Sequence, residues 1–289
     1  MLKAFLKAMR LKQWIKNGLI FAAIVFDRQI TNPDALFRTV AGALLFSLVA
    51  SAVYLVNDLS DVESDRNHAT KRHRPIASGA LPIPAAWIGA VLLLAFSLPL
   101  AYLLSPGFFL LTAGYFVLNI SYSLWLKHIA ILDVLFLASF YVIRVVVGVT
   151  LISVERFSPW LYIATTFVAL LMGVGKRRAE LIKASPEKGN TRKVLESYTL
   201  AYLDNLLLIV LTITIITYSL YTFSAENMPE NHLMMLTIPF IMYCIIRYQY
   251  LLQVKDIGEA PEALVLSDRP LQIAIALWGL SVLIIFYIT

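Results

Sequence analysis

Residues 57–79, NDLSDVESDRNHATKRHRPIASG, place four acidic side chains and then a run of cations between two long apolar segments. The chain of 289 residues is 60% hydrophobic and 15% charged, whereas about 25% of the residues in an ordinary soluble domain are charged. Several apolar runs approach or exceed the roughly 18 residues that mark a membrane-spanning helix. The sequence therefore predicts an all-α polytopic membrane protein, with this charged stretch at a membrane boundary.

The distribution of cations predicts the orientation of the spans. About nine spans are expected, centred near residues 22, 46, 94, 117, 140, 168, 212, 241 and 279. With this count, one side of the membrane carries only the cations Arg28, Arg38 and Arg156, and Arg144 falls inside the fifth span. Loops rich in Lys and Arg usually face the cytoplasm, so the N-terminus is expected inside and the C-terminus outside. The cations on the inner side are Lys3, Lys7, Arg10, Lys12, Lys16, Arg66, Lys71, Arg72, Arg74, Lys127, Lys176, Arg177, Arg178, Lys183, Lys188, Arg192, Lys193, Arg247, Lys255 and Arg269.

The N-terminal arm, residues 1–15, alternates apolar and cationic side chains at helical spacing. Such a segment is typical of an amphipathic helix that lies on an anionic membrane surface. No small-residue cleavage site precedes the first apolar run, so we expect the arm to be retained rather than removed as a signal peptide. Residues 1–289 are interpreted as one transmembrane domain.

The acidic half of the opening stretch has helical spacing. Asn57, Asp61 and Asp65 are four residues apart, and Asp58 lies three before Asp61. If the second spanning helix continues through them, all four lie on one stripe, whereas Glu63 points elsewhere. Carboxylates so arranged repel one another unless a cation lies among them, and hard oxygen ligands suit Mg²⁺. The alternative is a solvated helix end with scattered salt bridges.

The basic half follows at once. Lys71, Arg72 and Arg74 come before a turn that Pro75 and Gly79 favour. A metal held by carboxylates beside Lys and Arg suits a diphosphate, because the metal bridges its oxygens while the cations take the outer charge. The alternative is that these cations serve only membrane topology.

The stretch NDLSDVESD resembles the NDxxDxxxD motif of the UbiA superfamily of intramembrane prenyltransferases. The resemblance implies about nine helices around a central cavity open to the cytoplasm, and Mg²⁺ that ionises a prenyl diphosphate. Further stretches look like one branch, the decaprenyl-phosphate phosphoribosyltransferase group. That branch implies 5-phosphoribosyl 1-diphosphate as donor and a polyprenyl phosphate as acceptor. The stretches are MRLKQWIKNGLIFAA, YLVNDLSDVESDRNHATKRHRPIASG, NISYSLWLKHIAILDVLFLASFYVIRVVVG, GKRRAEL and PEALVLSDRPLQ.

One departure from the superfamily favours that branch. Prenyl-transferring relatives carry a second motif, DxxxD, at the inner end of the sixth helix, where this chain reads GVGKRRAEL. Carboxylates are expected where this chain has Gly175, Lys176, Arg177 and Arg178, and only Glu180 keeps an acidic group. Cations there suit an additional anion, either the 5-phosphate of the donor or the acceptor phosphate. Topology alone would also place basic residues at this helix end.

Four more residues are candidates for contact with phosphate or for structural pairing. Lys16 opens the first span, and Tyr122 and Lys127 surround the loop after the fourth. Arg144, inside a span, is expected to face a cavity or a partner. Asp133 is predicted to pair with Lys127 or Arg144.

The sequence therefore predicts Mg²⁺-dependent transfer of 5-phosphoribosyl to a polyprenyl phosphate, by an integral membrane protein whose active site faces the cytoplasm. Asp58, Asp61 and Asp65 are the expected catalytic residues, and together with Asn57 the expected metal ligands. Prenyl transfer to an aromatic or quinone-precursor acceptor is the alternative enzyme, and a transporter for a phosphorylated anion is the alternative class. Lipid bilayer is the expected surrounding, no nucleic acid is expected, and a homo-oligomer is left open.

Overall fold

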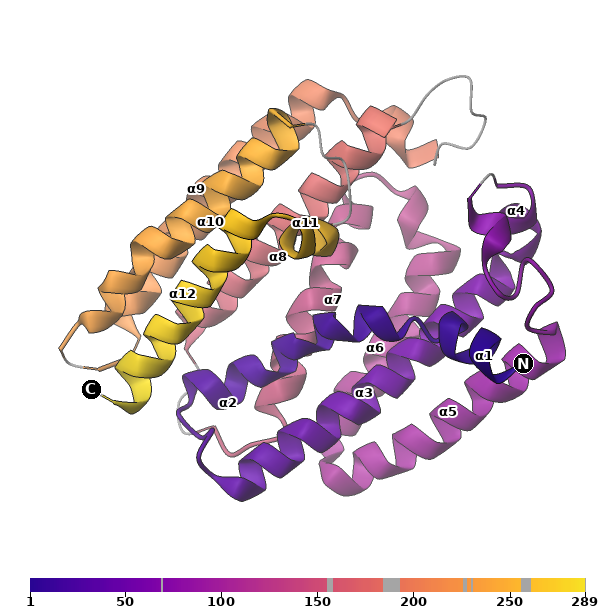
Figure 1. Ribbon diagram of the computed structural model, residues 1–289, viewed down its shortest axis with the longest axis horizontal. Helices are drawn as coiled ribbons and strands as arrows, with labels where there is room; N and C mark the ends of the chain where they lie inside the picture. Colours follow the sequence, from indigo (N-terminus) through magenta and orange to yellow (C-terminus); the bar gives the residue numbers. More distant parts are fainter. Residues whose placement is uncertain are drawn as a thin grey trace. The chain divides into compact units, whose positions relative to one another are not determined.

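The computed structural model describes residues 1–68, 70–154, 158–183, 193–225, 228–229, 231–255 and 261–288. Regular structure in these residues is helical throughout (Figure 1). By packing, the chain forms two compact units. Unit 1 comprises Met1–Ile24, Gln29–Leu126 and Ile143–Ser153, and unit 2 comprises Val25–Arg28, Lys127–Val142 and Val154–Thr289.

Unit 1 contains the acidic stretch. In its longest helix, α3, the side chain of Asn32 accepts hydrogen bonds from the backbone N–H groups of Asp34 and Ala35 at 3.1 and 3.3 Å. Pro33 follows at a first-turn position, where its missing N–H costs nothing. The helices of this unit are α1 (Leu2–Ala8), η1 (Leu11–Phe21), the start of α2 (Ala22–Phe26), α3 (Pro33–Ser60), α4 (Val62–Arg66), η2 (Lys71–His73), α5 (Ile83–Leu104), α6 (Pro106–Leu124) and the end of α7 (Leu132–Val149).

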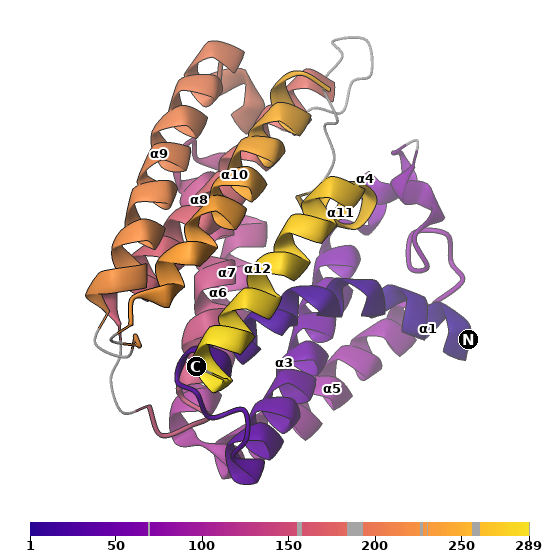
Figure 2. The same ribbon diagram turned by 60° about the vertical axis from the view of Figure 1, so that its left-hand side comes forward.

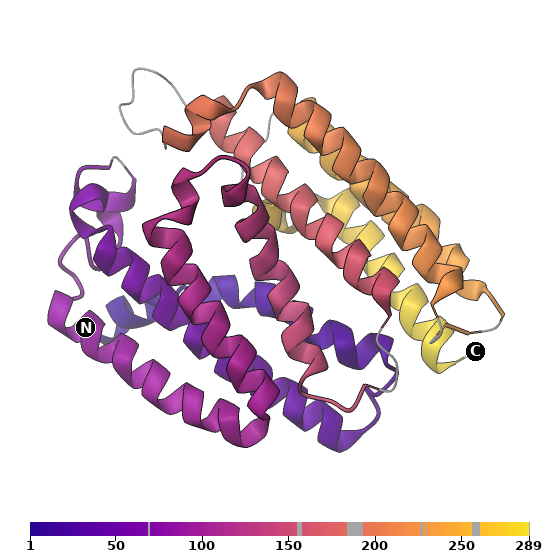
Figure 3. The same ribbon diagram turned by 180° about the vertical axis from the view of Figure 1, so that it is seen from behind.

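Helices α3 and α5 lie side by side (Figure 3). Ala86 and Ala90 of α5 are buried in one apolar cluster with Leu55 and Leu59 of α3. Small side chains let two helix backbones approach closely within a membrane. This contact holds the end of α3 that carries the acidic stretch.

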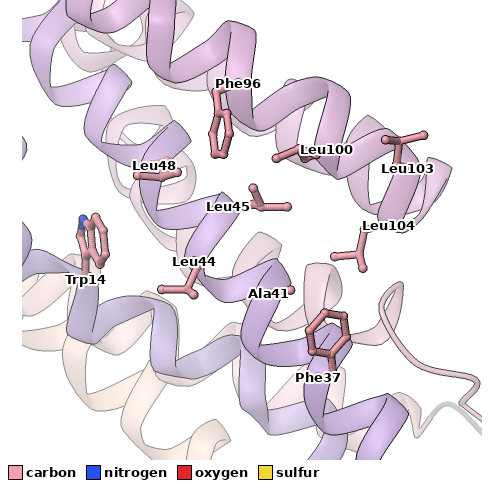
Figure 4. Close-up of a pocket in the computed structure, with 10 residues that line it drawn as sticks. All are labelled: Trp14, Phe37, Ala41, Leu44, Leu45, Leu48, Phe96, Leu100, Leu103 and Leu104. Atoms are coloured by element: carbon pink, nitrogen blue, oxygen red, sulfur yellow. The ribbon is translucent and has the colours of Figure 1, made fainter.

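The same two helices border an apolar pocket with a volume of about 590 Å³ (Figure 4). Its walls are hydrocarbon apart from Trp14 of η1, whose indole N–H donates to Ser51 Oγ at 3.0 Å. The lining residues are Trp14, Phe37, Ala41, Leu44, Leu45, Leu48, Phe96, Leu100, Leu103 and Leu104.

Unit 2 is built around α8 and α9, which pack along each other (Figure 2). Val174 of α8 and Leu203 and Leu207 of α9 are fully buried in its core. Its helices are most of η3 (Leu126–His128), the start of α7, α8 (Pro159–Lys183), η5 (Lys193–Ser197), α9 (Leu200–Ser224), η6 (Leu233–Thr237), α10 (Ile238–Gln253), α11 (Pro261–Ser267) and α12 (Arg269–Tyr287).

Helix α12 of unit 2 begins at a charged cap. Asp268 Oδ1 accepts from the backbone N–H of Leu271 at 2.9 Å, and its two oxygens accept from Arg247 at 3.2 and 2.8 Å. The hydrogen bond from Arg247 lowers the pKa of Asp268 below its usual value, against the effect of partial burial.

Within the described residues, eight helices are long and apolar enough to cross a membrane. This confirms the predicted all-α membrane architecture. The expected first span, near residue 22, falls instead on η1 and α2, so the count of nine stays a prediction. The eight are α3, α5, α6, α7, α8, α9, the run Leu233–Gln253 and α12.

The N-terminal arm differs from the single helix expected over residues 1–15. Helix α1 ends at Ala8, and Arg10 adopts a left-handed φ of 54° before η1 begins at Leu11. A left-handed residue interrupts a right-handed helix. The break is explained by the contact that the Arg10 side chain makes, described below. Three cations of the charge pattern, Arg156, Lys188 and Arg192, lie outside the described residues.

Candidate functional site

The acidic stretch is not one continuous helix. Helix α3 ends at Ser60 and α4 begins at Val62, with Asp61 between them at φ −96° and ψ 6°. The backbone N–H of Asp61 donates to Asn57 O at 3.0 Å, and that of Asp65 donates to Asp61 O at 2.8 Å. The i to i+4 bonding therefore persists across the break, so the helical spacing used in the prediction holds approximately.

Two of the carboxylates are buried against arginines. Asp58 and Asp65 are 2% and 1% exposed. Arg74 Nη1 donates to Asp58 Oδ1 at 3.1 Å and to Asp65 Oδ2 at 2.6 Å, so one guanidinium joins both. Arg10 Nη2 donates to the same Asp58 oxygen at 2.5 Å, and its guanidinium lies 4.8 Å from the ring centre of Tyr54. These positive charges offset the repulsion that the carboxylates would otherwise suffer.

The oxygens of this cluster fit a hard cation. Asn57 Oδ1 and Asp65 Oδ1 are both buried and have no hydrogen-bond partner. A buried polar atom without a partner is costly, and its presence calls for an ion or water. In the described part of the chain, no group of three His, Cys, Asp or Glu side chains could hold a metal alone. Mg²⁺ usually takes one or two carboxylates and completes its shell with water and substrate phosphates.

The loop after α4 places the predicted phosphate-binding cations differently. Arg74 is turned towards the carboxylates, while Lys71 is partly exposed and Arg72 is exposed. The turn is fixed by Ser78 N–H donating to Arg74 O at 2.9 Å, with Gly79 at φ 77°, a conformation that glycine adopts without strain. Arg74 therefore organises the carboxylates, and the other two cations remain available to solvent.

His68 belongs to the same loop, and its side chain bonds to the backbone of that loop. Its Nδ1 accepts from the backbone N–H groups of Thr70 and Lys71 at 3.2 and 3.4 Å. Partial burial, and after it the charge of Lys71, lowers the pKa of His68. A neutral His68 is what these two accepted hydrogen bonds require.

Arg144, the cation inside a span, is buried in a polar network of unit 1. Its Nε donates to Asn17 Oδ1 at 2.8 Å, and its Nη2 donates to the hydroxyl of Tyr115 at 2.9 Å. The guanidinium also lies over the rings of Tyr115 and Phe46, 5.1 and 5.6 Å from their centres. Asn17 in turn donates to Ser47. These contacts hold η1, which carries the partly exposed Lys16, against α3 and α6.

Two candidates lie close together in the sequence, around the end of α6. Tyr122, in the last turns of α6 in unit 1, is partly exposed, and so is Lys127, in η3 of unit 2. Each makes interactions within the protein.

The basic segment at the end of α8 is tied into a buried network of unit 2. Arg177 is 0% exposed, and its Nε donates to Asp133, which is also 0% exposed. Its Nη1 donates to Glu180, whose side chain is 30% exposed. Asp133 therefore pairs with Arg177, from a different helix. Lys176, the residue before, is partly exposed.

The family profile fits these observations. The sequence profile of the UbiA prenyltransferase family matches residues 18–176, which include the acidic stretch. The chain belongs to the UbiA prenyltransferase family.

Characterised relatives of this UbiA-family chain match over nearly its whole length. The decaprenyl-phosphate phosphoribosyltransferase of Corynebacterium glutamicum is 35% identical over 98% of this chain and 86% of its own. The enzyme with the same name from Mycobacterium tuberculosis is 36% identical over 94% of this chain and 90% of its own. These matches confirm both the resemblance seen in the motifs and the expectation of a transferase.

Solved structures show the same fold. A UbiA homologue from Archaeoglobus fulgidus, solved bound to GPP and Mg²⁺, superposes with a TM-score of 0.75 at 22% identity. The alignment covers 97% of this chain and 99% of the other.

Reasoning from the sequence missed the contacts of three residues. Arg10 was counted only among the cations of the arm, although its pairing with Asp58 joins positions 48 apart. Arg178 was named only as one of the cations that replace carboxylates in GVGKRRAEL, yet it is buried and donates to Asp204 Oδ1 and to Leu252 O, each at 2.6 Å. Tyr198 carried no motif at all. The one available signal was the excess of cations at inner helix ends, which topology explained equally well.

Proposed function

We propose that the protein transfers 5-phosphoribosyl from 5-phosphoribosyl 1-diphosphate to a polyprenyl phosphate and releases diphosphate. The observation that carries the proposal is the near full-length similarity, at 35–36% identity, to enzymes named decaprenyl-phosphate phosphoribosyltransferase. The cations of GVGKRRAEL agree with this proposal, because a donor that carries a 5-phosphate besides its diphosphate needs more positive charge around it than a prenyl diphosphate does.

Asn57, Asp58, Asp61 and Asp65 would hold Mg²⁺ against the donor diphosphate. The partnerless oxygens of Asn57 and Asp65 support this assignment, as does the Mg²⁺ in the homologue from Archaeoglobus fulgidus. When bound, Mg²⁺ would neutralise charge on the diphosphate and so make it a better leaving group.

The protein's own side chains bind and orient in this account. Arg74 and Arg10 keep the carboxylates of Asp58 and Asp65 in place, and Lys71 and Arg72 balance the outer charge of the diphosphate. As the bond from C1 of the ribose to the diphosphate breaks, the electron pair leaves with the diphosphate. An oxygen of the lipid phosphate bonds to the opposite face of C1, with inversion. That phosphate is already ionised at neutral pH, so the step requires no strong general base.

In unit 2, we assign the 5-phosphate of the donor to the segment around Lys176. Arg177 and Glu180 belong to this segment, and Lys127 is a further candidate. Because Arg177 is fully buried in ion pairs, its part in binding is to order the segment while Lys176 supplies the accessible charge. Lys16, Tyr122 and Arg144 are proposed for the lipid phosphate or its surroundings.

Diphosphate release tests the proposal directly. Purified protein in detergent with Mg²⁺ is given phosphoribosyl diphosphate plus a polyprenyl phosphate, or a prenyl diphosphate plus an aromatic acid. Release is expected only with the first pair, and is expected to vanish in Asp61→Asn. Glu63→Gln is the matched control, since Glu63 is exposed and pairs with the exposed Arg66. Release from the prenyl diphosphate alone would replace this function with prenyl transfer, which the GPP and DMAPP bound to solved homologues favour.

We also propose that the N-terminus and the site face the cytoplasm and that the C-terminus lies outside. The one-sided distribution of Lys and Arg supports this orientation. Labelling of single cysteines at Lys3 and Ile288 in sealed vesicles, in a Cys244→Ser background, tests it. Access to both positions from the same side would contradict it.

A further inference from the structure

The hydroxyl of Tyr198 joins two segments of unit 2. It accepts a hydrogen bond from the backbone N–H of Ile131 at 2.6 Å and donates one to Asp133 Oδ1 at 2.6 Å. Tyr198 is buried, in the connection between η5 and α9. A phenol can donate and accept at once, and here both abilities are used.

The first segment carries Lys127 and is held in an unfavourable conformation. Ile131 has a φ of 71°, a left-handed value that is rare for a β-branched residue and has to be held by its surroundings. Immediately after it, the N–H groups of Val134 and Leu135 bond to Ile131 O at 3.1 and 3.0 Å and begin α7. The hydrogen bond to Tyr198 therefore acts at the point where the loop from Lys127 turns into a helix.

The second segment is the end of α8. Asp133, which accepts from Tyr198 through Oδ1, accepts from Arg177 through Oδ2. Arg177 also donates to Glu180, so Asp133, through Arg177, helps to fix the helical turn that includes Lys176. One hydroxyl is thus connected to both places where we assign phosphate-binding lysines.

We propose that Tyr198 is a positioning residue for the 5-phosphate of the donor, acting through Ile131 and Asp133 on Lys127 and Lys176. The proposal rests on the function proposed above. Burial, and then the hydrogen bond to Asp133, raises the pKa of Tyr198, so the hydroxyl stays protonated and continues to donate. Phenylalanine at this position keeps the ring and removes both hydrogen bonds.

The test compares Tyr198→Phe with Tyr202→Phe. Tyr202 stacks on Tyr198 with ring centres 6.1 Å apart, but it is exposed, so the control removes a hydroxyl from the same place without cutting the network. Two probes are titrated by calorimetry and as competitive inhibitors: ribose 5-phosphate, which has the 5-phosphate alone, and inorganic diphosphate with Mg²⁺. Loss of a hydrogen bond to a charged group weakens binding by about 10- to 100-fold.

We expect Tyr198→Phe to weaken the binding of ribose 5-phosphate by about 10- to 100-fold, with the affinity for inorganic diphosphate and kcat nearly unchanged and KM for the donor raised. Tyr202→Phe should match the wild type with both probes. A merely structural role would lower the active fraction, and hence kcat, without changing either affinity. That result, or equal weakening of both probes, overturns the proposal.

A second variant keeps the test decisive if Tyr198→Phe folds poorly. Glycine reaches φ 71° without strain, so Ile131→Gly in the Tyr198→Phe background should restore folding and part of the affinity for ribose 5-phosphate. Restored folding with no gain in that affinity overturns the proposal. The proposed function is judged separately, by whether the wild type turns over phosphoribosyl diphosphate. A wild type that binds ribose 5-phosphate but does not turn over the donor would contradict the proposed function. A wild type that turns over the donor but does not bind ribose 5-phosphate would contradict the role proposed for Tyr198.

Discussion

Replacing Asp133 with Asn tests whether the buried pair with Arg177 stabilises unit 2. Asparagine keeps the shape of aspartate and its oxygen can still accept the hydrogen bond from Tyr198, so the change removes the charge and places an NH₂ donor against Arg177. Both partners are 0% exposed, and removing one member of a buried pair costs about 3–5 kcal/mol. Glu180 still balances part of the charge of Arg177, so we expect a loss of about 2–3 kcal/mol, at or slightly below the lower limit of that range. At about 2–4 °C per kcal/mol, the unfolding midpoint falls by about 4–12 °C.

The assay is thermal unfolding in detergent, followed by tryptophan fluorescence. Asp34→Asn is the matched control, because Asp34 and its partner Arg38 have side chains 74% and 42% exposed. Exposed pairs contribute about 0–1 kcal/mol, so this variant should melt close to the wild type. The double change Asp133→Leu with Arg177→Met should be more stable than the Asp133→Asn single variant, because no charge is left buried. Equal midpoints for Asp133→Asn and Asp34→Asn would refute the reasoning.

Three other results are expected. Gly148→Ala should lower the free energy of unfolding by about 1–3 kcal/mol, since the new Cβ would lie 2.1 Å from a backbone oxygen of η1. Gly114→Ala, whose Cβ would meet nothing within 4 Å, should be neutral or slightly stabilising in the same melting assay. The hydrogen bond from Arg247 depresses the pKa of Asp268. The ionised Asp268 carboxylate therefore stabilises the folded protein above the unfolded pKa of about 3.9, and this stabilisation is lost as the pH falls through the lower pKa of the folded state. Asp268→Asn should flatten that acid limb, and an unchanged limb would contradict the assignment. Added Mg²⁺ should raise the melting midpoint of the wild type but not of Asp65→Asn, and an equal rise in both would count against the cation site.

The sequence predicted the membrane helices well and indicated that Asp58 and Asp65 lie close together, because hydropathy and helical spacing are local properties. It did not predict the partners of the buried charges. Asp133 was predicted to pair with Lys127 or Arg144, yet the 11 residues from Asp133 to Arg144 correspond to about 16 Å along a helix. The true partners, Asn17 for Arg144 and Arg177 for Asp133, lie 127 and 44 positions away. Pairing across such distances depends on how helices pack, which a single sequence does not state.

The break at Asp61 shows the same limit on a smaller scale. Nothing in NDLSDVESD marks position 61 as the end of a helix, since neither Gly nor Pro is present. Arg74 joins Asp58 and Asp65 from beyond the turn at residues 71–73. The acidic residues were therefore found from their spacing, whereas the arginines that hold them required the structure.

The most direct measurement follows two labels from phosphoribosyl diphosphate in the presence of a polyprenyl phosphate and Mg²⁺. Phosphoribosyl transfer predicts that ³²P in the 5-phosphate enters the organic, lipid-extractable phase, while ³²P in the terminal phosphate of the diphosphate stays in water as free diphosphate. The transfer of the 5-phosphate label to lipid and the release of labelled diphosphate should both disappear in Asp61→Asn and persist in Glu63→Gln. Terminal label in the lipid phase, or 5-phosphate label that never leaves the aqueous phase, would contradict the account.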